Sequence, residues 1–355
     1  DGEGATQGDG GGAGTRDVAK AAGLLGIDPD DLAYALTHRT WQSASRASVT
    51  VIPMTADQAR ASRNGLAKAL YNALFSWLAD RTNQATLPDP EGHPGCERRF
   101  IGLLDIFGFE ILAHNGFEQL CINYANEILQ GMFNRHIFTL EQEMYVENGI
   151  DWSMLEFKSN QALIDLIAKK PKGIFPLLES QNIKGASAKD GAFLSVCAKT
   201  NADNDRFAPS RFSGDDFVVR HYAGDVVYHS TGFCSKNNDS LHRDLLAIVR
   251  ASESDFVADI FFVEGSSAVK EIEKSKKKMM QANTVSRRLT DQMHKLQETL
   301  DATTLSFVRC VKPNGAKVAA NSEDVAGAYD AAMVRNQLNY LGVMEQLQER
   351  AAGGG

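Results

Sequence analysis

Hydrophobic residues recur at intervals of three and four through most of the chain, which predicts a largely helical protein. Two short helices are expected between residues 17 and 40, with Asp28-Pro29 at the start of the second. A long helix should begin after Thr55, where Gln58 is placed to complete a capping box. The next long helix is expected from Phe117 to about Tyr145, a length of about 40 Å. Shorter helices are expected near 240–249, 289–300 and 333–347.

Other runs have the composition of β-strands. Phe100–Leu104 is apolar without alternation, which predicts a strand that is buried on both faces, and Leu305–Val311 is predicted to be another buried strand. Phe217–Tyr222 and Val226–His229 flank Ala223-Gly224-Asp225, and this arrangement predicts a hairpin. His221 and His229 lie in that hairpin, and we interpret them as strand residues because no third metal ligand is spaced nearby. Helices together with buried strands indicate an α/β protein.

Composition narrows the class of protein. The chain has 355 residues, enough for two or three domains, and its hydrophobic content of 43% is ordinary for a globular protein. The net charge of −8 argues against a nucleic-acid-binding protein, which needs a broad basic surface. Basic charge is concentrated locally, at Lys270, Lys274, Lys276, Lys277 and Lys278. Such a cluster is either a solvated helix face or a surface that steers an acidic partner.

Cysteine spacing and hydropathy indicate in which cellular compartment the protein is expected. The five cysteines form no C-x-x-C pair, which favours reduced thiols in a cytoplasmic protein. We expect no membrane span, because no apolar run approaches the length of a bilayer crossing, and we find no signal peptide. Residues 1–16 are rich in glycine and are predicted to be flexible. They do not form a phosphate-binding loop, because Gly14 precedes Thr15 where that motif has lysine.

The candidate chemistry lies at the end of the first apolar run. Asp105 follows Leu104 directly, and Gly108 comes three residues later. At a sheet edge, a carboxylate can hold a Mg²⁺-bound water, and a glycine allows a backbone N–H to approach a γ-phosphate. Asp-x-x-Gly alone also fits an ordinary turn after a strand, so the pattern indicates a nucleotide site only together with its surroundings.

Those surroundings resemble the myosin head. Asp105–Glu110 followed by Asn115–Glu127 is similar to the switch II loop and relay helix of that family, without a gap. Further similar blocks follow in the family's order, at Phe133–Phe138, Glu141–Tyr145, His221–Val226, Phe307–Asn314 and Gln337–Glu345. The resemblance runs from about Asp17 to Glu345.

The resemblance implies an α/β, P-loop NTPase-type myosin motor that is incomplete. It would comprise mainly the helical lower actin-binding subdomain and part of the central sheet. After the flexible residues 1–16, we expect a helical upper part at 17–98 and switch II, relay and actin-binding subdomain at 99–262. A basic surface loop would occupy 263–284, and a return strand with a final helix 285–355.

The same resemblance implies roles for individual residues around ATP and Mg²⁺. Asp105 would hold Mg²⁺ through a water molecule, and Gly108 would donate its backbone N–H to the γ-phosphate. Phe107 lies between them in the nucleotide-binding loop. Glu110 would pair with an arginine of switch I and close the site behind the attacking water. Residues 117–145 would be the relay helix, which couples this loop to a lever arm.

The resemblance also implies F-actin as a partner. The turn at 179–191 is similar to the helix-loop-helix that docks on actin, and the basic cluster takes the place of an actin-facing surface loop. The implied contacts are Gln181, Asn182, Ile183, Lys184, Lys270, Lys274, Lys276, Lys277 and Lys278. Calmodulin-like light chains would bind a lever arm outside this chain. The location implied is the actin cytoskeleton of the cytoplasm.

Two hypotheses therefore stay open. The family's P-loop, switch I and converter are expected outside the matched region, so we expect a fragment of a motor. Under the first hypothesis the intact gene product is an actin-activated Mg-ATPase that moves on actin. Under the second, the chain binds actin without turning over ATP. We also expect an isolated chain to leave apolar strand faces uncovered, because the strand that carries the P-loop is missing.

Overall fold

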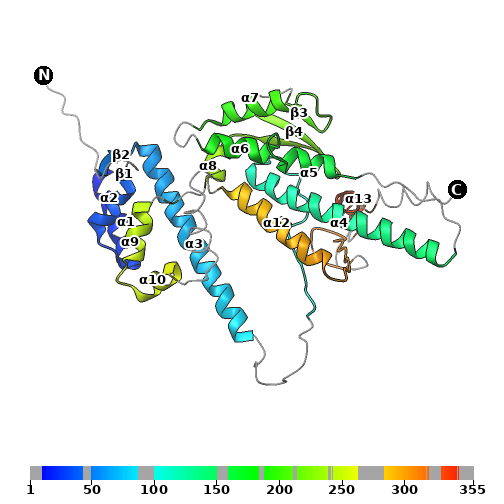
Figure 1. The fold of residues 1–355 in the computed structure, drawn as a ribbon, viewed down its shortest axis with the longest axis horizontal. Coiled ribbons are helices and arrows are strands. Elements are labelled where there is room, and N and C mark those ends of the chain that lie inside the picture. Colours follow the sequence, from blue (N-terminus) through cyan, green and yellow to red (C-terminus); the bar gives the residue numbers. More distant parts are fainter. Residues whose placement is uncertain are drawn as a thin grey trace. The chain divides into compact units, whose positions relative to one another are not determined.

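The computed structural model describes residues 10–42, 49–86, 100–149, 159–183, 188–210, 214–238, 241, 243–262, 284–316, 318–319, 329–341 and 343. The chain divides into two compact units, each assembled from two separate stretches of sequence (Figure 1). The first unit comprises Asp1–Ile101 and Asp239–Asn283, and the second comprises Gly102–Asn238 and Thr284–Gly355. Residues 239–262 thus belong with the N-terminal stretch, and not with the segment 99–262 in which the sequence analysis grouped them.

The first unit is a set of helices with one small sheet. Its elements are α1 (Gly10–Leu25), α2 (Pro29–Thr37), β1 (His38–Gln42), β2 (Val49–Pro53), α3 (Ala56–Thr86), α9 (Arg243–Arg250) and α10 (Asp255–Phe262). Strands β1 and β2 pair antiparallel, with His38 opposite Pro53. The core comes from all the helices, through Ala22, Leu32, Ala35, Leu66, Ala73, Leu245, Val249, Val257, Ile260 and Phe261.

Helix starts in this unit follow the sequence signals. The Asp28 carboxylate accepts hydrogen bonds from the Asp30 and Asp31 backbone N–H groups at the start of α2. Thr55 and Gln58 form the predicted reciprocal capping box before α3. The prediction for residues 1–16 was wrong in part, because α1 begins at Gly10. Helix α1 is anchored by the buried Ala22, and glycine costs a helix only about 1 kcal/mol per residue.

A turn at Gly26 joins the two stretches of the first unit. Gly26 has φ +60°, and its carbonyl accepts a 2.8 Å hydrogen bond from the Glu253 N–H. The Ser252 hydroxyl donates to the Leu25 carbonyl at 2.6 Å. A Cβ atom at Gly26 would lie 2.7 Å from the Ser254 backbone nitrogen. Only glycine therefore combines the left-handed conformation with this close approach.

The second unit surrounds a three-stranded antiparallel sheet. Its strands are β3 (Phe207–Pro209), β4 (Asp216–His221) and β5 (Gly224–His229), in the order β3-β4-β5 with Val218 opposite Val227. Its helices are α4 (Phe117–Glu147), α5 (Gln161–Ala168), α6 (Ile174–Asn182), α7 (Asp190–Thr200), α8 (Phe233–Asn237), α12 (Val285–Asp301) and α13 (Ala331–Tyr340). The predicted long helix and hairpin are both confirmed.

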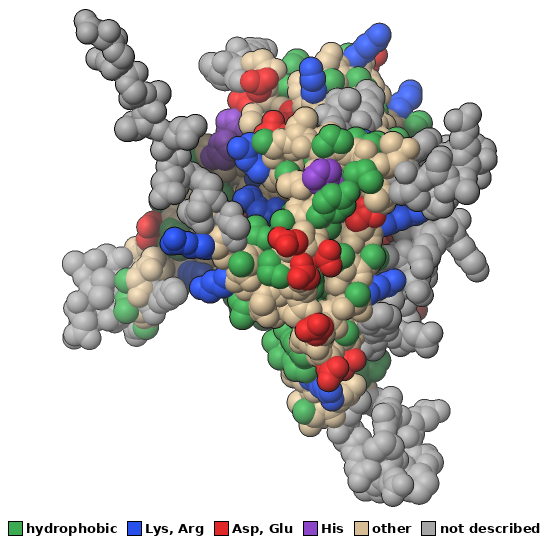
Figure 2. All heavy atoms as spheres, turned by 90° about the vertical axis from the view of Figure 1, so that its left-hand side faces the viewer, with side chains coloured by type: hydrophobic (Ala, Val, Ile, Leu, Met, Phe, Trp, Pro, Cys, Tyr) green, Lys and Arg blue, Asp and Glu red, His purple; other side chains and the backbone are tan. Residues whose placement is uncertain are grey.

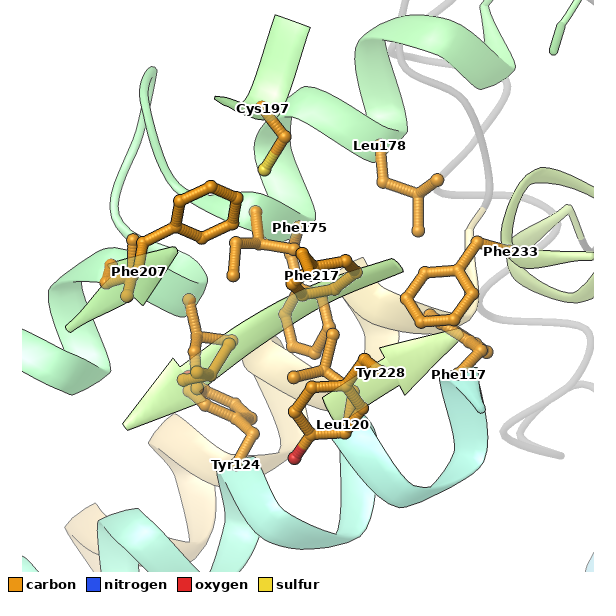
Figure 3. Close-up of a cluster of buried hydrophobic side chains, with 14 of the residues drawn as sticks. Phe117, Leu120, Tyr124, Phe175, Leu178, Cys197, Phe207, Phe217, Tyr228 and Phe233 are labelled. Atoms are coloured by element: carbon orange, nitrogen blue, oxygen red, sulfur yellow. The ribbon is translucent and has the colours of Figure 1, made fainter. Parts of the chain in front are cut away.

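Aromatic rings form the centre of this unit (Figure 3). The Phe217 ring of β4 contacts the rings of Phe193, Phe207, Tyr228 and Phe233, at centroid distances of 5.6 to 6.5 Å. On the α4 side, Phe117 and Tyr124 pack against Phe175 of α6. The N-terminal half of α4 is therefore part of the core, whereas its last turns, from Glu143 to Glu147, are largely exposed.

The two predicted buried strands are wrong. Residues 100–104 and 305–311 form no strand, and Leu103 and Val308 expose 97% and 84% of their surface. The apolar run at 100–104 predicts burial on both faces, but burial needs neighbouring strands and covering helices. Within the described ranges, the two sheets are β1-β2 and β3-β4-β5, and neither includes these segments. Phe100, Ile101 and Phe107 are exposed as well.

Hydrophobic side chains also lie on the surface of the first unit. Tyr71, Leu74, Phe75 and Leu78 are exposed along α3, and hydrophobic side chains are visible among charged ones on the face in Figure 2. No described helix is long and apolar enough to cross a membrane. Cys121, Cys197, Cys234 and Cys310 are free thiols, as the spacing predicts for these four.

The turn at Gly26 provides a test of the first unit. We expect Gly26→Ala to lower the free energy of unfolding by about 2 kcal/mol, because the new methyl group meets the Ser254 backbone in a strained conformation. Urea denaturation followed by circular dichroism measures the change. Gly23→Ala is the matched control in α1, where nothing lies within 4 Å, and it should be neutral or stabilising by up to about 1 kcal/mol. Equal stabilities of the two variants would contradict the prediction.

Candidate functional site

The candidate nucleotide loop is exposed up to Gly108 and becomes buried at Phe109. Asp105, Phe107 and Gly108 are exposed, whereas Phe109 is buried and Glu110 is half-buried. The Phe109 ring packs edge-on against the rings of His221 at 5.0 Å and Tyr222 at 5.3 Å. Burial of one aromatic side chain therefore anchors a loop whose candidate functional groups face outward.

The loop is open to solvent at Gly108. A Cβ atom built at Gly108 meets nothing within 4 Å, so its backbone can be approached closely. The Asp105 carboxylate lies three residues away on the same exposed stretch. These two residues would hold Mg-ATP as an N–H donor to phosphate and as an oxygen acceptor for a Mg²⁺-bound water.

Helix α4 holds the loop through two asparagines. The Asn123 side chain accepts from the Glu110 N–H at 2.8 Å and donates to the Glu110 carbonyl at 2.8 Å. The Asn126 side chain donates to the Phe107 carbonyl at 2.9 Å. We call the paired bonds between Asn123 and the Glu110 backbone the Asn123 clasp. Because the clasp satisfies both backbone groups of one residue, any movement of Glu110 away from α4 breaks two hydrogen bonds together.

The Glu110 side chain has a local partner. Its carboxylate accepts a 3.2 Å hydrogen bond from the Gln119 amide. The Gln119 side-chain oxygen in turn accepts from the Gly116 N–H at 3.0 Å, at the first turn of α4. The side chain that is predicted to pair with switch I thus rests on the start of α4.

A buried acid lies one turn beyond the clasp. The Glu127 carboxylate is fully buried and accepts hydrogen bonds from His221 Nδ1 at 3.0 Å and the Tyr222 N–H at 3.1 Å. It also accepts from the Asn160 amide at 2.7 Å. Close contact with Asn160 depends on Gly131, where a Cβ atom would lie 2.7 Å from the Asn160 side-chain oxygen. Glu127 therefore joins α4 to the end of β4 and to the start of α5.

Tyr228 connects this acid to the clasp. Its hydroxyl lies 2.9 Å from Asn123 Nδ2 and 2.9 Å from His221 Nε2. In Figure 3 its ring lies among the core hydrophobic side chains. Burial raises the pKa of Tyr228 well above its ordinary value, so the hydroxyl keeps its proton.

The far half of α4 contacts the segment after α12. Arg309 donates to the Gln130 side chain at 3.0 Å, and its guanidinium lies 4.2 Å from the centre of the Phe133 ring. Burial lowers the pKa of Arg309. The Phe307 ring packs edge-on against Phe133 at 4.9 Å. Helix α4 thus contacts the candidate loop near its start and residues 307–309 near its middle.

The predicted actin contacts fall into two groups. Gln181 and Asn182 at the end of α6 are buried, and the Asn182 amide donates to the Cys234 carbonyl at 2.7 Å. Ile183, next in the chain, exposes 64% of its surface. Other predicted contacts lie outside the described residues, namely Lys184, Lys270, Lys274, Lys276, Lys277 and Lys278. The structure therefore brings Gln181 and Asn182 into the packing of α6 on α8 and leaves Ile183 at the surface.

Sequence reasoning missed the polar residues behind the loop. Asn123, Glu127, His221 and Tyr228 were predicted only as parts of a helix and a hairpin. One signal was present, because Asn123 and Glu127 lie four residues apart next to the apolar stripe of α4. Their partners follow about a hundred residues later in the chain, so the contact itself was not predictable from spacing.

Comparison with known proteins supports the resemblance. The family model described as "Myosin head (motor domain)" matches residues 4–354. The chain is 38% identical over 335 residues to Myosin-I heavy chain of Dictyostelium discoideum, covering 94% of this chain and 13% of that protein. It is 37% identical to Myosin-2 of Arabidopsis thaliana, covering 95% of this chain and 26% of that protein. It is 35% identical to Unconventional myosin-Vb of Homo sapiens, covering 93% of this chain and 18% of that protein.

Replacing Glu127 tests whether the buried acid holds the unit together. We expect Glu127→Gln to lower the free energy of unfolding by about 3 kcal/mol, because the new amide NH₂ faces a donor and leaves it without an acceptor. Glu118→Gln is the matched control, since Glu118 lies on the same helix in an exposed ion pair with Lys236. That change should cost less than about 1 kcal/mol. Urea denaturation compares them, and similar losses in both variants would refute the role of Glu127.

Proposed function

Because this chain belongs to the myosin head (motor domain) family, we propose that it is part of an actin-based motor that couples ATP hydrolysis to filament binding and movement. The chain spans 13% to 26% of the length of the relatives described above. The observation that carries the proposal is the Asn123 clasp, which ties the candidate nucleotide loop to a helix of 31 residues.

The loop would bind the terminal phosphate of Mg-ATP. Gly108 would donate its backbone N–H to the γ-phosphate, and Asp105 would hold Mg²⁺ through a water molecule. Phe107 would lie beside the nucleotide, and Glu110 would exchange its Gln119 partner for an arginine of switch I. Mg²⁺ would supply charge neutralisation on the phosphate oxygens. The exposure of Asp105, Phe107 and Gly108 supports this proposal, since all three are free to meet a ligand.

Helix α4 would carry the state of the loop to distant parts of the motor. Because Asn123 and Asn126 hold two separate points of the loop, a shift at Gly108 or Glu110 pulls on α4 directly. A helix of this length spans about 45 Å. Its exposed last turns are the part that would act on a lever arm, on which calmodulin-like light chains would bind.

The actin-binding surface would lie at the turn between α6 and α7. Ile183 would contact actin directly, while Gln181 and Asn182 would hold the turn in place from within the core. Lys184 and the basic cluster at 270–278 would add attraction to acidic residues of F-actin. The protein would then work in the actin cytoskeleton of the cytoplasm.

The second candidate function is an actin-binding module without ATP turnover. The contrast between two regions of the second unit favours it. The helices α6 and α7 have an aromatic core behind them, whereas Leu103, Leu104 and Phe107 are exposed. The predicted partial architecture is a lower actin-binding subdomain with part of the central sheet. In such a protein, α6 and α7 would bind actin, whereas the nucleotide site that follows Leu104 would be incomplete.

Substitution of Gly108 tests the nucleotide proposal. We expect Gly108→Ala to leave the fold unchanged, because its methyl group meets nothing within 4 Å, but to slow Mg-ATP hydrolysis at least about 100-fold. The methyl group would separate the backbone N–H from the phosphate. Phosphate release by the 355-residue chain is measured with and without F-actin. Hydrolysis at an equal rate in the variant would contradict the role of Gly108, and a chain that binds actin with no hydrolysis would favour the second candidate.

Cosedimentation with F-actin tests the proposed partner. We expect the chain to pellet with filaments at low salt, and Ile183→Asp to weaken binding about tenfold by placing a charge on the exposed end of α6. Val146→Asp adds the same charge at an exposed position on α4 and should bind like the unchanged chain. Absence of pelleting at low salt would count against both candidate functions.

A further inference from the structure

A chain of hydrogen bonds runs through the buried interior behind the candidate loop. It begins at the Glu110 backbone and passes through Asn123, Tyr228 and His221 to the Glu127 carboxylate. The side chains of Asn123, Tyr228 and Glu127 are fully buried, and that of His221 is too. Every donor in this path must therefore find its acceptor within the protein.

The backbone fixes the polarity of this path at the loop. The Glu110 N–H is always a donor, so the Asn123 atom at 2.8 Å must be the amide oxygen. Asn123 Nδ2 then has two hydrogens. One goes to the Glu110 carbonyl, and the other goes to the Tyr228 oxygen at 2.9 Å. Tyr228 is thus an acceptor towards Asn123.

The polarity is also fixed at the opposite end. The Tyr222 N–H donates to Glu127 Oε1, and the Asn160 amide donates to Oε2. Asn160 cannot be turned around, because the same amide nitrogen donates to the Glu127 backbone carbonyl at 2.7 Å. Glu127 is therefore an acceptor throughout, and His221 Nδ1, 3.0 Å from Oε1, must carry a hydrogen.

Only one placement of hydrogens on Tyr228 and His221 then satisfies the middle of the path. Burial keeps the proton on Tyr228, and its oxygen already accepts from Asn123. The hydroxyl hydrogen is left to point at His221 Nε2, 2.9 Å away, which has to be a bare acceptor nitrogen. An imidazolium at His221 would donate from Nε2 to the Tyr228 oxygen and would take away the acceptor of the hydroxyl hydrogen. The other neutral tautomer would set the Nδ1 lone pair against the Glu127 carboxylate.

We propose that His221 is held as the neutral tautomer with its hydrogen on Nδ1, and that Tyr228 and His221 act through Asn123 as positioning residues for the loop that carries Glu110. The consequence for ATP hydrolysis rests on the proposed function, whereas the tautomer and the positioning of the loop do not. All bonds of the path point one way, from Asn123 towards Glu127. The orientation of the Asn123 amide is therefore set from inside the protein as well as by the loop.

The tautomer is tested by ¹⁵N nuclear magnetic resonance of the labelled full chain at pH 7. His221→Gln identifies the signals of His221 by their loss. We expect a protonated-nitrogen shift for Nδ1 and a bare-nitrogen shift for Nε2. A hydrogen on Nε2, alone or together with one on Nδ1, would overturn the proposal. The variant serves only to assign the signals, and the tautomer itself is read from the unchanged chain.

Positioning is tested by hydrogen exchange of the full chain with Tyr228→Phe. We expect backbone exchange at residues 107–112 to accelerate about tenfold, because one hydrogen of Asn123 loses its acceptor and the Glu110 backbone alone then orients the amide. Strands β4 and β5 should keep their protection. Tyr124→Phe is the matched control, since Tyr124 is equally buried on α4 and lies outside the path.

The results of the exchange experiment test the positioning role of Tyr228 separately from the proposed motor function. Unchanged exchange at 107–112, or an equal loss of protection across β4 and β5, would overturn the positioning role of Tyr228. The same acceleration in Tyr124→Phe would overturn it too. Neither experiment uses nucleotide or actin, so a failure of the Gly108 or Ile183 tests leaves these results intact and is recognisable as a failure of the proposed function alone.

Discussion

The burial of one carboxylate, Glu127, constrains the arrangement of the second unit. A buried charge is tolerated in a protein only where hydrogen-bond donors surround it. Here the donors come from three places, the ring of His221 in β4, the backbone of Tyr222 in the following turn, and the amide of Asn160 before α5. Any packing of α4 that moved Glu127 away from these groups would strand a charge in the core. The long helix therefore has one position against the hairpin.

Other parts of the unit follow from that position. With α4 in place, Asn123 lies against the Glu110 backbone, and Phe109 fills the space beside His221 and Tyr222. Gly131 leaves room for Asn160 on the same helix. The candidate loop is thus held by polar bonds on one side and by an aromatic contact on the other, while Asp105 and Gly108 remain at the surface. A rigid support behind an exposed loop is suited to a site that responds to a ligand.

The sequence predicted those features that depend on local patterns. The spacing of apolar residues from Phe117 onward identified α4, and Ala223-Gly224-Asp225 between two β-rich runs identified the hairpin. Asp28 and Thr55 identified two helix starts. The predictions of strands at 100–104 and 305–311 were wrong. Apolar residues favour burial, but a strand is buried only where another layer packs against it. The interior path was missed for a related reason, since the pattern around Asn123 does not identify Tyr228, more than a hundred residues later.

Helix α4 is held by hydrogen bonds at Asn123 and Glu127, near its start, whereas its last turns are exposed. Beyond Phe133, which contacts Phe307, about 14 residues of helix remain, a distance of about 20 Å. A tilt of about 10° at that contact would displace the far end by about 4 Å, by simple trigonometry on that length. A change in the direction of the packed part of α4 would therefore be larger at the exposed tip than at the loop.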